Sequence, residues 1–268
     1  RDSVASRGLG DVYKRQVSIL LTISPTMVYF SRFARNDILM AVFTLGLILT
    51  MWKYLMYGHK RYLYVMSALL ALSFSTKEST YLVVGTLGLY LTVSTIYDTL
   101  KTPISSSETK FFSYPSFAWF YIVRITSVLK DCFYTQPYSR SFTLLILLIS
   151  LTLPQWSAFT SVFQNTLFMG WSNMVLASGE GTSNIGMPSH GGKVLAFLIV
   201  IGLMLTSAYM GSKWHWKTWC KCALIFYAIW LAAYTTMFTN IAGGVQSGIW
   251  QSLGYRIVQQ GEGRGGQP

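Results

Sequence analysis

SPTMVYFSRFARND, residues 24–37, connects an apolar run at residues 17–30 with a second apolar run at residues 38–54. Arg32, Arg35, Asn36 and Asp37 place four strongly polar side chains in this connection. Charges at the end of a membrane helix are costly unless they have a partner or a function. The fold and the candidate site therefore both depend on what these side chains face.

The composition predicts a membrane protein. Of the 268 residues, 52% are hydrophobic and only 11% are charged, and the mean hydropathy is +0.41, whereas a soluble domain carries about 25% charged residues. The net charge of +12 is concentrated between apolar runs, as in the cytoplasmic loops of membrane proteins, and this argues against nucleic-acid binding. The three cysteines, Cys132, Cys220 and Cys222, match neither a zinc spacing nor a disulfide framework.

The apolar runs predict an all-α, polytopic bundle of about seven transmembrane helices. A helix needs about 20 apolar residues to cross a bilayer, and several runs fall short of this length. The expected spans are residues 17–30, 38–54, 62–74, 81–97, 142–153, 194–210 and 222–238. Residues 111–129 are aromatic and apolar but contain Pro115 and Arg124, so we expect an interfacial helix there.

Lysine and arginine predict the orientation of this bundle in a cell membrane. Seven spans place the basic segments 53–61, 98–140 and 211–221 on one side, which the positive-inside rule makes cytoplasmic. Residues 32–37 and 77–78, a loop at 155–193 and a Gly-rich tail at 239–268 then lie on the extracytoplasmic face.

The two ends of the chain suggest a fragment. Residues 1–16, RDSVASRGLGDVYKRQ, are polar, have no periodicity and resemble a translated sequencing adaptor. We therefore expect a non-native leader at residues 1–16, followed at residues 17–268 by a fragment of one transmembrane domain.

The expected outer face carries three cations that break the positive-inside trend: Arg32, Arg35 and Lys77. A bound anion explains them, and a lipid phosphate is the natural candidate. Asp37 and Glu78 then either hold a divalent cation, which prefers carboxylate oxygens, or neutralise the arginines. Two simpler interpretations stay open: Asn36 or Asp37 caps the helix that begins at Ile38, and Lys77 and Glu78 form a solvated turn.

Three further side chains in the expected outer loop are candidates for contact with a sugar. Trp156 and Trp171 either stack on a sugar ring or belong to an aromatic belt at the membrane surface. His190 is either a base or ligand, or an ordinary loop histidine, because no partner lies at metal-binding spacing.

The order of these motifs resembles the GT-C superfamily of membrane glycosyltransferases, which includes protein O-mannosyltransferases and lipid A aminoarabinose transferases. Residues 24–39 are similar to an external turn of that superfamily, and residues 76–78 to the lysine-containing turn that follows it. The segments YTTMFTN (234–240), QSLGYR (251–256) and RGGQP (264–268) resemble an uncharacterised prokaryotic branch labelled flippase-associated or mannosyltransferase-like.

The resemblance implies transfer of a sugar from a polyprenyl-phosphate donor, with either a retaining or an inverting outcome. Arg32, Arg35 and Lys77 match groups that bind the lipid-linked phosphate, and Asp37 matches an acidic position associated with metal or acceptor. The catalytic base of such enzymes lies in an earlier loop, upstream of Val17, so we expect this fragment to be inactive alone. A transporter or lipid flippase and a non-catalytic scaffold are the alternatives, although a transporter predicts charged or broken positions at mid-span. The sequence does not indicate the oligomeric state.

Overall fold

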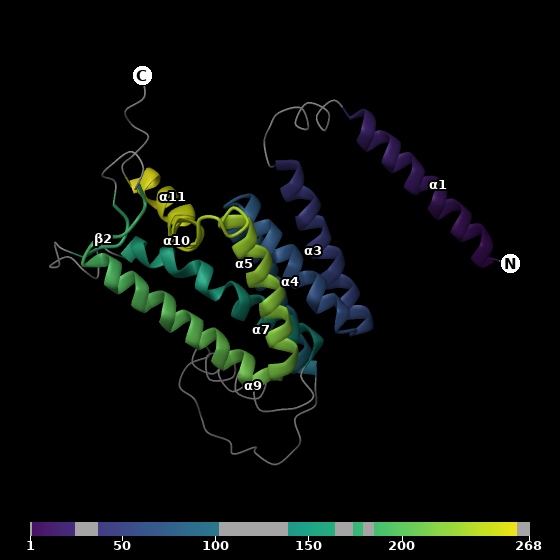
Figure 1. Ribbon diagram of the computed structural model, residues 1–268. Helices are drawn as coiled ribbons and strands as arrows, with labels where there is room; N and C mark the ends of the chain where they lie inside the picture. Colours follow the sequence, from purple (N-terminus) through teal and green to yellow (C-terminus); the bar gives the residue numbers. More distant parts are fainter. Residues whose placement is uncertain (1, 25–36, 102–138, 164–173, 179–184, 262–268) are drawn as a thin grey trace, which may run out of the picture.

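The computed structural model describes residues 2–24, 37–101, 139–163, 174–178 and 185–261 (Figure 1). These residues are almost entirely helical, which confirms the prediction of an all-α fold. The strands in the described part are β1 (Met174–Val175) and β2 (Ser189–His190), which pair antiparallel in a two-residue sheet. The interfacial helix expected at residues 111–129 lies outside the described ranges.

Four of the described helical segments are long and apolar enough to cross a membrane, judged by length and composition alone. The 16-residue α4 (Arg61–Thr76) is about 24 Å long, shorter than a typical hydrocarbon core. The 22-residue α1 (Asp2–Ile23) lies apart from the other helices in Figure 1. A membrane helix bundle is therefore confirmed, and seven spans stay a prediction. The four segments are α3 (Asp37–Tyr57), Thr80–Asp98 within α5 (Thr80–Lys101), α7 (Arg140–Thr152) with its continuation η1 (Leu153–Phe163), and α9 (Gly192–Tyr234).

The α7–η1 segment is the centre of the bundle. Its apolar window is 78% buried inside the protein, whereas the other three windows are 17–33% buried. Leu144, Leu147 and Leu151 of α7 have no exposed surface. Because lipid is as apolar as leucine, close packing rather than exclusion of water stabilises such a core. The surrounding helices α3, α5 and α9 leave much of their apolar surface available to lipid.

Arg140, the first residue of α7, connects two helices at one end of the bundle. Its guanidinium donates hydrogen bonds to the carbonyl oxygens of Leu55 (2.8 Å) and Met56 (2.6 Å) in the last turn of α3. These carbonyls have no partner within their own helix, and a cation there also complements the helix dipole. Arg140 thus fastens the start of α7 to the end of α3, at the opposite end of α3 from Asp37.

The loop expected at residues 211–221 is wrong, because α9 is helical across it. The helix runs from Gly192 to Tyr234 and leaves helical geometry at His215 (φ −143°, ψ 88°). In Figure 1 this bend, called the elbow below, lies at the bottom of the view. The expected span at residues 194–210 lies in one arm of α9, and most of the expected span at 222–238 lies in the other arm, which ends at Tyr234. Trp219 holds the elbow, because its indole N–H donates to Ser150 Oγ of α7 at 3.0 Å.

The expected outer loop also begins later than predicted. Pro154 does not end the helical segment. After α7 the chain continues as the 3₁₀ helix η1 (Leu153–Phe163). A proline is tolerated where a new helical segment begins, because the amide hydrogen it lacks has no partner there. Gln155 consequently lies in the interior with 1% of its surface exposed.

We expect Gln155→Met to raise the thermal unfolding temperature of the protein in detergent micelles. Neither the amide nitrogen nor the amide oxygen of the buried Gln155 side chain has a hydrogen-bond partner among the described residues. Such an unsatisfied group costs about 1–3 kcal/mol, and methionine has a similar length without this need. An unfolding temperature lowered by the substitution would contradict the prediction.

The C-terminal segment, expected to be a polar, Gly-rich tail, contains helices up to Gly261. Asn240 begins α10 (Ile241–Gln246), since its Oδ1 accepts a hydrogen bond from the backbone N–H of Gly243 at 3.1 Å. A turn of π-helix, η2 (Ser247–Gln251), and α11 (Ser252–Gly261) follow. The sequence did not predict these helices, because the frequent glycines suggested a tail.

A left-handed turn connects α9 to α10. Thr236, Met237 and Phe238 have φ values of 51°, 55° and 70°, which are unfavourable for residues with a side chain. The Thr235 hydroxyl oxygen accepts a hydrogen bond from the Phe238 amide at 3.0 Å and supports the turn. The turn reverses the chain immediately after Tyr234, so that the C-terminal helices pack back against the end of the bundle (Figure 1).

Candidate functional site

The candidate site is built on the short turn between α4 and α5, residues 77–79. Lys77 ends α4 in an extended conformation (φ −159°, ψ 146°), and its amide donates to the carbonyl oxygen of Ser73. The buried Thr80 hydroxyl lies 2.7 Å from the Ser73 carbonyl oxygen and 2.8 Å from that of Lys77. These contacts hold the backbone of the turn and leave the Lys77 and Glu78 side chains free to point outward.

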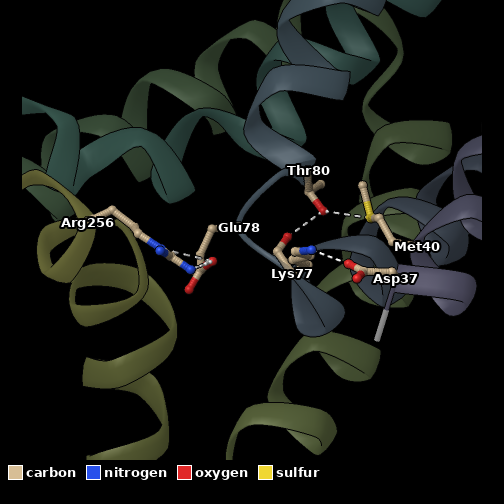
Figure 2. A network of polar contacts seen from close by, with 6 residues as sticks. All are labelled: Asp37, Met40, Lys77, Glu78, Thr80 and Arg256. Carbon is tan, nitrogen blue, oxygen red and sulfur yellow. Dashed lines mark hydrogen bonds and ion pairs between the residues drawn. The ribbon is translucent and has the colours of Figure 1, made fainter. Parts of the chain in front are cut away.

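Lys77 forms an ion pair with Asp37, the first residue of α3 (Figure 2). The two side chains are 40% and 32% exposed, so the pair lies at the surface of the bundle. A carboxylate in the first turn of a helix is also stabilised by the helix dipole. The structure therefore brings together two of the predicted site residues that are 40 positions apart in the chain.

Glu78 forms a second ion pair, with Arg256 of α11. Arg256 Nη2 lies 3.1 Å and Nε lies 3.3 Å from the same carboxylate oxygen, Oε2. Figure 2 shows the two pairs on either side of the turn. Arg256 was quoted only within the motif QSLGYR and was not predicted as a site residue. The available signal was that Arg256 is one of two basic residues in a tail expected on the same face as Glu78.

A cavity of about 330 Å³ lies beside the turn. Its walls come from the end of α4, the end of α9, and the C-terminal segment η2–α11. The lining is polar apart from aromatic rings and consists of Phe74, Ser75, Thr76, Lys77, Glu78, Tyr234, Ser247, Gln251, Ser252 and Tyr255. The Tyr234 hydroxyl donates to the Phe74 carbonyl oxygen at 2.8 Å and joins two of these walls.

The π-helical turn η2 is part of this wall. A π-helix turns the chain more slowly than an α-helix, and such turns occur frequently at functional sites. Ser247 and Gln251, the first and last residues of η2, both line the cavity, while Ile249 and Trp250 between them are buried. The irregular turn therefore presents polar side chains to the cavity and apolar ones to the core.

Backbone contacts with the β1–β2 segment position α11. A β-carbon on Gly254 of α11 would lie 2.3 Å from the carbonyl oxygen of Gly186, and one on Gly186 would lie 2.2 Å from the amide nitrogen of Tyr255. Only glycine permits so close an approach. The buried Trp250 indole N–H donates to the Leu176 carbonyl oxygen at 2.7 Å. The segment therefore positions Tyr255 at the cavity and its neighbour Arg256 against Glu78.

Of the other predicted site residues, Trp156 lies away from this cluster. Arg32, Arg35 and Trp171 lie outside the described residues. Trp156 packs edge-on against Tyr81 (ring centroids 5.2 Å apart) and Phe159 (6.1 Å), against the apolar core, and does not line the cavity. The backbone of His190 belongs to β2, opposite Met174.

The two carboxylates of the site neutralise cations. Asp37 faces Lys77 and Glu78 faces Arg256. Within the described ranges, no group of three or more His, Cys, Asp or Glu side chains is placed to hold a metal ion. Of the two roles considered for Asp37 and Glu78, charge neutralisation is the one that the described contacts favour, with Lys77 and Arg256 as the partners.

Comparison with known proteins identifies one family for part of the chain. Residues 14–121 match the family model described as dolichyl-phosphate-mannose-protein mannosyltransferase. The matched segment is less than half of the chain and contains Asp37, Lys77 and Glu78, but not α7 or the C-terminal helices. No curated protein and no solved structure matches the chain. The match confirms the resemblance to mannosyltransferase-like membrane glycosyltransferases and supports a membrane glycosyltransferase-like function.

Proposed function

We propose that the cavity beside the α4–α5 turn binds the phosphate of a polyprenyl-phosphate-linked sugar, from which the complete protein transfers the sugar to an acceptor. The observation that carries this proposal is the paired Lys77 and Asp37 beside a polar cavity, within the segment that matches a mannosyltransferase family. The name of that family contains a lipid-phosphate sugar donor, dolichyl-phosphate mannose, and we propose the same class of donor for this protein.

The position of the cavity suits a lipid-linked donor. It lies at the end of apolar helices, where a phosphate can stay in the polar region while a polyprenyl chain lies along the lipid-exposed helix faces. Lys77 supplies a charge-assisted hydrogen bond to the phosphate, which is stronger than a neutral one. We assign Arg32 and Arg35 to the same phosphate, since they immediately precede Asp37 in the chain.

The proposed roles of the carboxylates follow from their positions. Asp37 orients Lys77 and contacts the acceptor, and Glu78 forms the wall nearest α11. The catalytic base belongs to an earlier loop, as the resemblance implies. The orientation that the basic segments predict places this site on the extracytoplasmic face of the cell membrane.

We expect Lys77→Ala to weaken binding of polyprenyl-phosphate mannose by about 10-fold or more, because a hydrogen bond to a charged group contributes about 1.5–3 kcal/mol. Binding is measured on the full chain in detergent micelles with a labelled donor. Neutral polyprenol is the reference ligand, and its affinity is expected to stay unchanged. Equal donor affinity in the wild type and in Lys77→Ala would remove Lys77 from the phosphate site.

We expect Asp37→Asn, in a protein that includes the upstream loop, to abolish sugar transfer and to leave the protein folded. Transfer is followed with radiolabelled polyprenyl-phosphate mannose, and folding by the thermal unfolding temperature. Asparagine also begins helices well, so the substitution preserves the start of α3. Full transfer activity in this variant would reduce Asp37 to a helix-terminal residue.

A further inference from the structure

Arg256 contacts Glu78, a residue that lines the cavity, and uses only part of its hydrogen-bonding capacity among the described residues. Its Nε and Nη2 both contact one oxygen, Glu78 Oε2, at 3.3 Å and 3.1 Å. A guanidinium has five N–H donors in a planar fork that matches the oxygens of a phosphate. The contact to Glu78 therefore does not use the paired, two-oxygen geometry in which arginine binds most strongly.

The ion pair is also exposed enough to exchange. The Arg256 and Glu78 side chains are 46% and 33% exposed, and ion pairs in such positions contribute little to stability. Glu78 itself lines the cavity, as does Tyr255, the neighbour of Arg256 in α11. An anion in the cavity thus competes directly with Glu78 for the same guanidinium.

The charges at the turn are balanced in two ion pairs. Lys77 is neutralised by Asp37, and Arg256 by Glu78, so that each cation beside the cavity already has a carboxylate. Figure 2 shows that these partners come from opposite sides, from α3 and from α11. A phosphate that binds at the turn can contact two cations, Lys77 of the turn itself and Arg256 of α11.

We propose that Arg256 is a second phosphate-binding residue of the cavity, and that it exchanges Glu78 for the phosphate of the lipid-linked donor. This proposal rests on the proposed function and extends the site to α11, outside the segment that matches the family model. The close contact of Gly186 with Gly254 holds α11 at this position. The ligand chemistry is a phosphate ester, and a free phosphate ion has the same chemistry at its oxygens.

Two substitutions at one ion pair test the proposal because they have opposite expected effects. Arg256→Ala should weaken binding of undecaprenyl phosphate to the full chain in detergent by about 10-fold, with partial retention in Arg256→Lys. Glu78→Gln removes the competing charge and should tighten binding several-fold. Arg61→Ala is the matched control, because it removes one exposed positive charge outside this cavity and should leave the affinity unchanged. Thermal unfolding temperatures within a few degrees of the wild type show that all variants are folded.

Two further ligands, undecaprenol and inorganic phosphate, distinguish failure of this proposal from failure of the proposed function. Undecaprenol, which lacks the phosphate, should bind all variants alike, and inorganic phosphate should compete only at much higher concentration than the lipid phosphate. Effective competition by inorganic phosphate at equal concentration would identify a free ion as the ligand. Weakening by Glu78→Gln as strong as that by Arg256→Ala would make the pair a structural contact and overturn the proposal. Wild-type protein without preference for undecaprenyl phosphate over undecaprenol would instead overturn the proposed function itself.

Discussion

Gly186→Ala is expected to destabilise the protein by about 2–5 kcal/mol and to abolish measurable binding of the lipid phosphate. Gly186 has a φ of +80°, and its β-carbon would lie 2.2 Å from the amide nitrogen of Tyr255. The left-handed conformation costs alanine about 1–2 kcal/mol, and overpacking adds about 1–3 kcal/mol. Relief of the clash requires α11 to move, and with it Tyr255 and Arg256.

The measurements for Gly186→Ala are the thermal unfolding temperature in detergent and the affinity for undecaprenyl phosphate. Gly85→Ala is the matched control, because no atom lies within 4 Å of a β-carbon at that helical position of α5. Alanine is the better helix former by up to about 1 kcal/mol, so this variant should be as stable as the wild type or more. Unchanged stability and binding in Gly186→Ala would mean that α11 does not depend on this contact.

Gly211→Leu is expected to disrupt the elbow of α9 and to lower the unfolding temperature strongly. A β-carbon on Gly211 would lie 2.3 Å from Cδ2 of the Trp219 ring, and the ring is buried and bound to Ser150 through its N–H. The ring must therefore leave Ser150 or the two arms of α9 must separate. Inserting bulk into a packed core costs about 1–3 kcal/mol, occasionally more.

Gly202→Leu, in the same helix, provides the comparison for Gly211→Leu. No atom lies within 4 Å of a β-carbon at Gly202, and the position is exposed on a face that lipid can cover. Both substitutions replace glycine by the same helix-forming residue, so their difference reports the contact with Trp219. Similar unfolding temperatures for the two variants would show that the elbow is not held by this ring.

Much of the fold followed from composition and apolar runs. Low charge and long apolar segments predicted a membrane helix bundle, and the polar residues at 37 and 77–78 correctly marked the ends of α3 and α4. The same runs did not predict the helicity of residues 211–221, because a basic, Trp-rich segment is equally typical of an interfacial loop. Nor did they predict η1. Pro154 suggested the end of the helix, but the chain continues as η1 and packs Gln155 into the core.

The candidate site was predictable in part. Asp37, Lys77 and Glu78 were named from the sequence, because charged residues between apolar runs need a partner. The partner of Glu78 was not predicted. An ion pair between positions 78 and 256 depends on how the C-terminal segment folds back onto the bundle. Trp156 was expected in an outer loop, either stacked on a sugar or in an aromatic belt, but η1 carries it inward, where it packs edge-on against Tyr81 and Phe159.

The sequence alone determines that this chain is a helical membrane protein with charges gathered at helix ends, because hydrocarbon tolerates apolar helices and excludes unpaired charge. Only the tertiary structure decides which charges meet. The left-handed turn after Tyr234 returns the C-terminal helices to the bundle, and the contact of Gly186 with Gly254 then brings Arg256 to Glu78. Such pairings depend on backbone directions and on close approaches between distant segments, which local residue patterns do not encode.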